Sequence, residues 1–326
     1  MRWTRLVLGL TLLILNIGAA SDSLIEFRNL AESVKQFSRQ YGFKETKNFR
    51  DFSSTGQHCL YYHPKSRIPF SYLDMSEKFV SSAILSEALE QARVDPDRYD
   101  AWLYINMVFA GGTKITPAFL KKKKSQRDQA ETILHEDWHD TANLPYHLEE
   151  ASGELIKIAG AATFLGQEKE LDQRLKEKLN WENSVNQKHA ELTALAELLA
   201  ENQIPKPEYF TKKAALIKYW PWNEGITKIA HWHSYSYYFP LMYRLFYATG
   251  KDLHKFTQIL LNLPPNINGN APKWRGSAKQ YFHNTRAAEI RIESYLEQII
   301  QEFTCPKSHA IGQAPPLLNW GGFILP

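Results

Sequence analysis

Apolar residues recur every three or four positions over much of the chain, which is the spacing of one buried face of an α-helix. The first such stretch runs from Ser23 to Tyr41, and Gly42 follows it as a helix stop. A second stretch, from Ser76 to Ala92, also predicts a helix. Later in the chain the same pattern predicts long helices over residues 126–141, 146–166, 169–202, 208–219, 234–249, 252–263 and 277–303.

Two segments in the first third of the chain predict strands instead. Residues 57–74 hold an apolar and aromatic run followed by prolines, and residues 101–110 are aliphatic and aromatic up to a glycine pair. The chain has no strand–helix alternation and no glycine-rich phosphate loop, which argues against a doubly wound nucleotide-binding fold. We therefore predict an α+β fold, mainly α, in which a small N-terminal β element precedes a large helical lobe.

The first 20 residues have the pattern of a secretory signal peptide. Arg2 and Arg5 precede the apolar run from Leu6 to Gly18, and small residues follow at Ala19-Ala20-Ser21. The apolar run is shorter than the roughly 20 residues that a membrane span needs; an uncleaved N-terminal anchor is the alternative. Cleavage predicts a secreted or periplasmic protein without stable membrane insertion.

Composition narrows the classes of function. Apolar residues make up 44% of the chain and charged residues 23%, which is typical of globular proteins. The net charge of +4 is small and scattered, and it argues against a nucleic-acid partner. Cys59 and Cys305 are too few for a cysteine-based zinc finger. In an oxidising compartment they either pair or remain separate thiols.

One motif carries a specific chemistry: His135-Glu136-Asp137-Trp138-His139, an H-E-x-x-H within a predicted helix. His135 and His139 lie four residues apart and therefore project from the same face. Two imidazole nitrogens one turn apart suit Zn²⁺ as ligands. Glu136 beside them is placed to take a proton from a water that the metal activates. The alternative is a solvated helix face whose histidines have other partners.

An acidic cluster follows the motif. Leu144-Pro145 ends the first helix, and Glu149, Glu150 and Glu154 lie in the first turns of the next. A carboxylate from this helix would complete a three-residue ligand set and leave a fourth position open for water. Glu150 and Glu154 are four residues apart, so one can bind the metal while the other holds the second N–H of a ligand histidine. Charge compensation at a helix N-terminus is the alternative.

This combination resembles the gluzincin group of zincin metallopeptidases, which includes thermolysin. The segment Glu150-Ala151-Ser152-Gly153-Glu154 is similar to the N-E-x-x-S-D pattern of that group, with Glu150 at the metal ligand and Glu154 at the outer acid. Glu149 stands where the pattern has Asn, so the choice between Glu149 and Glu150 stays open, and the spacing after His139 is shorter than in thermolysin. The resemblance implies a zincin-like fold, Zn²⁺ as cofactor and peptide hydrolysis.

Residues 60–260 also resemble a bacterial family of predicted zinc aminopeptidases. Members of that family have a strand and loop before the zinc helix, as residues 99–120 do here, and later a tyrosine-rich segment like residues 234–245. The segment from His231 to Tyr238 supplies the groups that we expect to stabilise the developing oxyanion, and the core of a large helical lobe is its alternative. The resemblance implies aminopeptidase activity and places polar site residues of this segment at His233 and Tyr235. No G-x-M-E-N segment is present, so the choice between exopeptidase and endopeptidase stays open.

Two further features bear on the predicted site. The stretch from Met107 to Thr116 is an expected edge strand above the metal, to which an extended substrate can add by main-chain hydrogen bonds. An ordinary sheet edge is its alternative. His147 is close to the motif in sequence, and it is either an additional ligand or a histidine at the start of a helix.

We predict a zinc metallopeptidase with three regions: a signal peptide at 1–20, a zinc-binding catalytic region at 21–166, and a helical region at 167–326 that completes the cleft. Its partner is a peptide or protein substrate. A secreted helical binding protein, whose structural or vestigial zinc is enclosed by a fourth ligand such as His147, is the alternative. A third reading is a metal-dependent hydrolase of non-peptide amides or esters.

Overall fold

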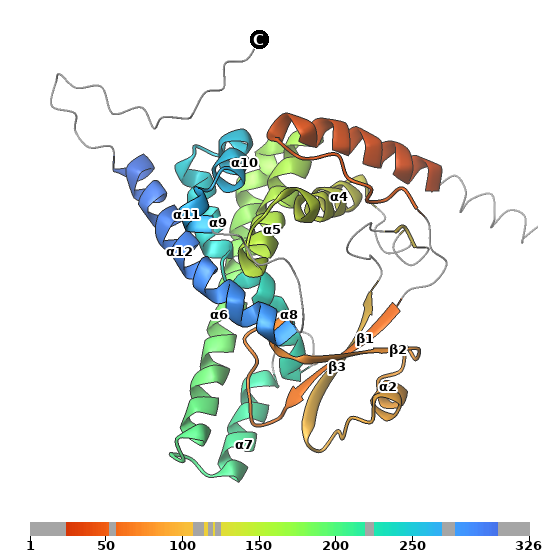
Figure 1. The fold of residues 1–326 in the computed structure, drawn as a ribbon, viewed down its shortest axis with the longest axis vertical. Helices are drawn as coiled ribbons and strands as arrows, with labels where there is room; N and C mark the ends of the chain where they lie inside the picture. Colours follow the sequence, from red (N-terminus) through yellow and green to blue (C-terminus); the bar gives the residue numbers. More distant parts are fainter. Residues whose placement is uncertain are drawn as a thin grey trace, which may run out of the picture.

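The computed structural model describes residues 24–51, 57–106, 114–116, 120, 125–218, 225–268 and 278–305. These residues are mainly helical with a small three-stranded antiparallel sheet (Figure 1), which confirms the predicted α+β, mainly α class. The predicted signal peptide and most of the predicted edge strand from Met107 to Thr116 lie outside the described residues. Within the described part, no helix combines the length and the apolar character needed to cross a membrane.

The sheet has the strand order β2-β1-β3. The central strand β1 (Gln57–Pro64) runs antiparallel to both β2 (Ser76–Val80) and β3 (Tyr99–Asn106). Leu60, on one face of the sheet, packs against helix α2 (Leu85–Ala92). The opposite face carries Trp102 and Tyr104 of β3 toward His231 of the helical lobe, because side chains alternate between the faces of a strand.

The predicted helix from Ser76 to Ala92 is wrong over its first half, since Ser76–Val80 forms β2 and only Leu85–Ala92 is helical. The residues of β2 pair in register with β1, Phe79 opposite Cys59. Hydrogen bonds to a neighbouring strand override a local helical preference, because strand formation depends on tertiary context. Cys59 is buried, Cys305 is exposed and both are free thiols, which settles the alternatives left open for this pair.

The helical predictions are otherwise close to the observed elements. Residues 24–38 form a helix that continues as a 3-10 turn, and Gly42 ends it with a left-handed φ of 88°. The later helices are α4 (Gln126–Thr141), α5 (Tyr146–Phe164), α6 (Leu171–Ala200), α7 (Lys206–Ile217), α8 (Gly225–Ser236), α9 (Phe239–Ala248), α10 (Leu253–Leu261), α11 (Pro265–Asn268) and α12 (Ala278–Thr304).

The predicted single helix over residues 234–249 is wrong, because this segment contains the end of α8, a turn and all of α9. Pro240 lies in the first turn of α9. A proline is tolerated there because the first N–H groups of a helix have no partner within it, but it interrupts a helix that is already running. The proline therefore marks the start of a new helix.

The largest core cluster joins helices from both sides of residue 166. Trp138 of α4 and Leu155 of α5 pack in one cluster with Phe239 and Phe246 of α9 and Ile292 of α12. A second cluster holds the helix of residues 24–38 against α4 through Phe27 and Ile133, among others. In Figure 1, α4 and α5 lie in the middle of the molecule, with α12 crossing one side and the sheet below. The hairpin of α4 and α5 is therefore held from several directions.

Candidate metal centre

Helix α4 carries the H-E-x-x-H motif and has a well-defined start. The hydroxyl of Ser125 accepts a hydrogen bond of 3.0 Å from the backbone N–H of Asp128, which satisfies one of the free donors of the first turn. Ile133, Leu134 and Trp138 are buried on its core side. This burial fixes the rotation of the helix about its axis, so the histidines of the motif must point toward α5.

Helices α4 and α5 approach each other closely at the motif. A Cβ atom on Gly153 of α5 would lie 3.0 Å from Nδ1 of His135 and 3.4 Å from Cδ1 of Trp138. The indole N–H of Trp138 donates a hydrogen bond of 2.8 Å to the hydroxyl of Ser152. The absence of a side chain at Gly153 lets the two helices pack closely enough for their functional groups to meet.

Three of the predicted ligands converge between these helices. Ligand atoms of His135, His139 and Glu150 all lie within 4.8 Å of one another. The two Nε2 atoms are 3.1 Å apart, and Oε2 of Glu150 lies 3.2 Å from Nε2 of His135 and 3.5 Å from Nε2 of His139. Glu150 is 4% exposed, which places a carboxylate where burial requires a partner of positive charge.

The other two acids of the cluster contact the outer nitrogens of the same histidines. Nδ1 of His139 donates a hydrogen bond of 2.8 Å to Oε1 of Glu149. Oε1 of Glu154 lies 3.6 Å from Nδ1 of His135. Glu149 therefore orients His139, a candidate ligand, while Glu150 points between the two rings. The geometry favours Glu150 over Glu149 as the third ligand.

The charges of the cluster favour a cation at its centre. Burial opposes a charge on His139, but the carboxylates of Glu150 and Glu149 outweigh burial and raise the pKa of His139 well above its ordinary value. Burial would raise the pKa of Glu154, but Lys157, Lys178 and His135 hold that pKa well below its ordinary value. Two imidazole nitrogens and a carboxylate oxygen form a donor set that Zn²⁺ accepts, and the residues present fit this metal.

Glu136 lies beside the ligands on α4, and its backbone is anchored from the N-terminal segment. Nδ2 of Asn48 donates hydrogen bonds to the carbonyl oxygen of Glu136, at 3.1 Å, and to Oδ1 of Asp137, at 3.0 Å. Burial raises the pKa of Tyr104 to about 12, with further contributions from the negative charges of Glu136 and Glu150. Tyr104 of β3 is therefore near both carboxylates.

A set of phenol and imidazole groups surrounds the cluster. The ring of Tyr235, a predicted site residue on α8, stacks at 6.3 Å from the ring of His135. The ring of His231, one turn earlier on the same face, lies 5.3 Å from that of Tyr235 and 4.8 Å from Trp102 of β3. Burial is the main cause that lowers the pKa of His231 to about 4, so its ring is neutral near pH 7.

Three tyrosines that the structure brings near the cluster had no predicted site role: Tyr72, Tyr104 and Tyr146. For each of them, burial raises the pKa, and negative charge nearby, that of Glu150 included, adds to the shift. No local sequence pattern indicated these three residues. His231 belongs to the predicted donor segment from His231 to Tyr238, and it lies one helical turn before Tyr235.

The structure does not bring His233 or His147 to the cluster. Nδ1 of His233 donates a hydrogen bond of 2.7 Å to the carbonyl oxygen of Phe70, and its ring stacks on His189 at 3.7 Å. His147 lies 2.7 Å from Glu289 of α12 through Nδ1. Among the residues described, no fourth histidine, cysteine or acid joins the group formed by His135, His139 and Glu150.

Comparison with known proteins adds no constraint to this geometry, since no family model, curated protein or solved structure matches the chain.

Proposed function

We propose that this protein is a zinc-dependent peptidase. The observation that carries the proposal is the convergence of His135, His139 and Glu150, on two helices, next to Glu136. Zn²⁺ held by these three residues would supply a Lewis acid with a coordination position open to water or substrate. This donor set and this neighbouring carboxylate are what peptide hydrolysis at a zinc ion needs.

The roles of the chain's own groups follow from their positions. Glu136 is the general base that takes a proton from the attacking water and then delivers it to the leaving amine. Glu149 holds the Nδ1–H of His139 and thereby fixes the tautomer and orientation of that ring. Glu154 takes the corresponding position beside Nδ1 of His135.

His231 and Tyr235 are the proposed hydrogen-bond donors to the developing oxyanion. Both lie on one face of α8, and the ring of Tyr235 faces His135. Nδ1 of His231 is buried and forms no hydrogen bond within the described part of the chain. A buried ring nitrogen of this kind is available to substrate. His233 is not one of the proposed donors, because its Nδ1–H already donates to the carbonyl oxygen of Phe70.

The arrangement of sheet and helices supports a zincin-like fold. The β3 side chains Trp102 and Tyr104 face His231 of α8, so the sheet lies over one side of the site, and the α4–α5 hairpin forms the other. The same proposal includes three predictions from the sequence patterns described above: a peptide or protein substrate, aminopeptidase action, and a secreted or periplasmic location. A structural zinc closed by His147 has no support, because among the described residues His147 does not join the group formed by His135, His139 and Glu150.

The first experiment is the zinc content of the purified protein, compared among wild type, Glu150→Ala, Glu149→Ala and Glu136→Gln. We expect about one zinc per chain in wild type and in Glu136→Gln, and loss of zinc in Glu150→Ala. Glu149→Ala should keep zinc with roughly 10–100-fold weaker affinity, as is typical when a group that orients a ligand is removed. Wild type without zinc would contradict the proposal.

Turnover then tests the role of Glu136. A peptide library identifies a substrate that the wild type cleaves, and Glu136→Gln should cleave it about 10²–10⁴-fold more slowly, because general acid–base catalysis contributes about that factor. Glu136→Gln keeps the size of the side chain and removes its basicity. Full activity of this variant at wild-type zinc content would show that another group activates the water.

A further inference from the structure

A series of polar side chains runs from the candidate ligand His135 to helix α8. Oε1 of Glu154 lies 3.6 Å from Nδ1 of His135, and Oε2 of Glu154 lies 2.5 Å from Nζ of Lys178. The same Nζ lies 2.6 Å from Oε1 of Glu182. The hydroxyl of Ser236 donates to the other carboxylate oxygen of Glu182. Helices α4, α5, α6 and α8 are thus joined by consecutive polar contacts.

Lys178 is the central member of this series. Glu154 is 4% exposed and Glu182 is fully buried, so each carboxylate needs a positive partner. Lys178 contacts both carboxylates. Lys157 contacts only Glu154 of the two. Burial opposes the charge on Lys178, but the two glutamates raise its pKa above the ordinary value. One ammonium group therefore sets the position of two buried carboxylates.

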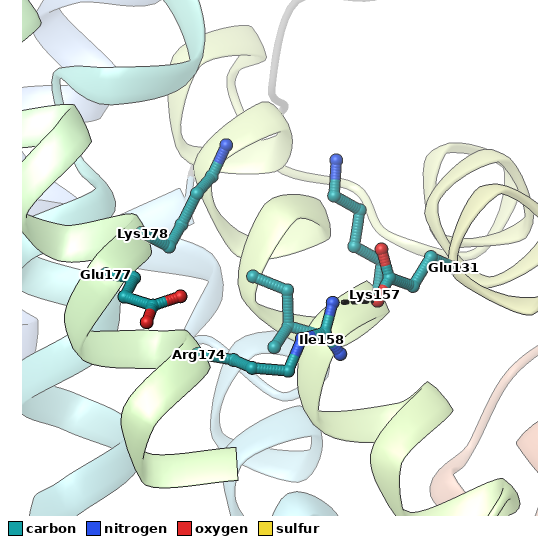
Figure 2. A pocket seen from close by; sticks show the side chains of 6 residues that line it. All are labelled: Glu131, Lys157, Ile158, Arg174, Glu177 and Lys178. Carbon is teal, nitrogen blue, oxygen red and sulfur yellow. Dashed lines mark hydrogen bonds and ion pairs between the residues drawn. The ribbon is translucent and has the colours of Figure 1, made fainter. Parts of the chain in front are cut away.

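Lys178 and Lys157 also line a pocket of about 320 Å³. Figure 2 shows Lys178 reaching from α6 and Lys157 from α5, with Arg174 paired to Glu131 below them. The three cations of this pocket all contact carboxylates of the protein. Each cation is therefore paired within the protein, and two of the three, Lys157 and Lys178, are paired with Glu154.

We propose that Lys178 is a positioning residue for the candidate metal centre. It holds the Glu154 carboxylate against Nδ1 of His135 and, through Glu182 and Ser236, ties that carboxylate to α8, the helix that carries His231 and Tyr235. An acceptor on the second nitrogen fixes the orientation and basicity of a ligand imidazole. The inference rests on the proposed function, because it assigns Lys178 a role in zinc binding.

The test compares Lys178→Met, the double variant Lys178→Met/Glu182→Gln, and Lys188→Met. Lys188 is on the same helix and pairs with the partly exposed Glu191, so it is a matched control for loss of a lysine from α6. Two properties are measured: zinc affinity, by competition with a chelator, and the thermal unfolding temperature of the metal-free protein.

We expect Lys178→Met to lose zinc affinity by about 10–100-fold and to unfold at lower temperature, because two buried carboxylates lose their shared cation. The double variant removes one of those charges, so it should regain unfolding temperature but not zinc affinity, since Glu154 still lacks Lys178. Lys188→Met should match wild type in both properties, as expected for a surface pair.

Two results would overturn the role of Lys178 while leaving the zinc site intact. One is wild-type zinc affinity in Lys178→Met. The other is a double variant that regains affinity together with unfolding temperature, which would make Lys178 a stabilising residue only. A wild-type protein that binds no zinc overturns the proposed function, on which this inference depends.

Discussion

Two groups of histidines in the described part of the chain differ in what holds their ring nitrogens. In the candidate metal centre, the Nε2 atoms of His135 and His139 point at each other and at Glu150. In the second group, Nδ1 of His233 is held by the carbonyl of Phe70 and Nε2 of His189 by the carbonyl of Pro69. His139 is partly buried and the other three rings are buried, but only the first group turns several donor atoms toward one point.

A candidate metal site and a structural histidine cluster are distinguished by where their ring nitrogens point. His189 and His233 stack face to face at 3.7 Å with an interplanar angle of 5°. Burial lowers the pKa of each, and both rings are therefore neutral near pH 7. Each ring donates to a backbone carbonyl, that of Pro69 or that of Phe70. In the candidate metal centre, the outer nitrogen of His139 is likewise held, by Glu149, but the Nε2 atoms of both rings and Oε2 of Glu150 converge on one point.

Zinc binding should respond most strongly when one histidine of each group is replaced by alanine. His135→Ala should abolish stoichiometric zinc binding, a greater loss than the roughly 10–100-fold typical of groups that only orient a ligand. His233→Ala should keep zinc and lower the stability of the metal-free protein by about 1–3 kcal/mol, because the Phe70 carbonyl loses its donor. Zinc analysis and chemical denaturation of both variants provide the measurement. Loss of zinc in His233→Ala would erase the distinction between the groups.

The next effect concerns the carboxylate that holds His147. Glu289 is fully buried and contacts both His147 and Arg286. Glu289→Ala should destabilise the protein by about 3–5 kcal/mol, because it leaves the buried His147 ring and the partly buried Arg286 cation without their shared acceptor, and zinc stoichiometry should not change. Glu297→Ala is the control on the same helix, since its pair with Arg244 is at the surface and is worth about 0–1 kcal/mol. Equal denaturation midpoints for the two variants would contradict the structural role of Glu289.

The smallest effect is the pH dependence of stability from the second group. Burial lowers the folded-state pKa of His189 and His233, so the unfolded chain binds more protons below about pH 6.5. Stability should therefore fall between pH 7 and pH 5, by roughly 1 kcal/mol for each histidine. The measurement is the denaturant midpoint of the metal-free protein at both pH values, for wild type and for His189→Asn. An unchanged pH slope in His189→Asn would rule out a contribution from His189.

Local sequence was enough to predict most helices but not the elements that depend on distant partners. Helix α4 has the predicted bounds, Gln126–Thr141, because Ser125 and the apolar stripe act within a few residues. Strand β2 was missed because its conformation depends on pairing with β1. Helix α8 begins at Gly225, earlier than predicted, since Ile226 and Ile229 of its first turns pack against Leu192 of α6, which is distant in sequence.

In the candidate site too, some residues could be identified from local sequence and others only from the folded structure. His135, Glu136 and His139 were identified from their spacing, and the acidic cluster that follows supplied Glu150. The choice against Glu149 required coordinates, because both residues lie at the start of α5 and only their rotation about the helix separates them. Tyr72 and Tyr104 lie far from the motif in sequence, and no local pattern indicates their approach to Glu150.

The four-residue connection between α4 and α5 has a consequence for the order of folding. Contacts within the hairpin are local: Glu149 and His139 are 10 residues apart. The contact between His233 and Phe70 spans 163 residues, and the contact between Glu289 and His147 spans 142. Closing a short loop costs less chain entropy and takes less time than closing a long one. We therefore expect amide protons of the hairpin to gain protection from exchange, in pulsed labelling during refolding, before those around His233.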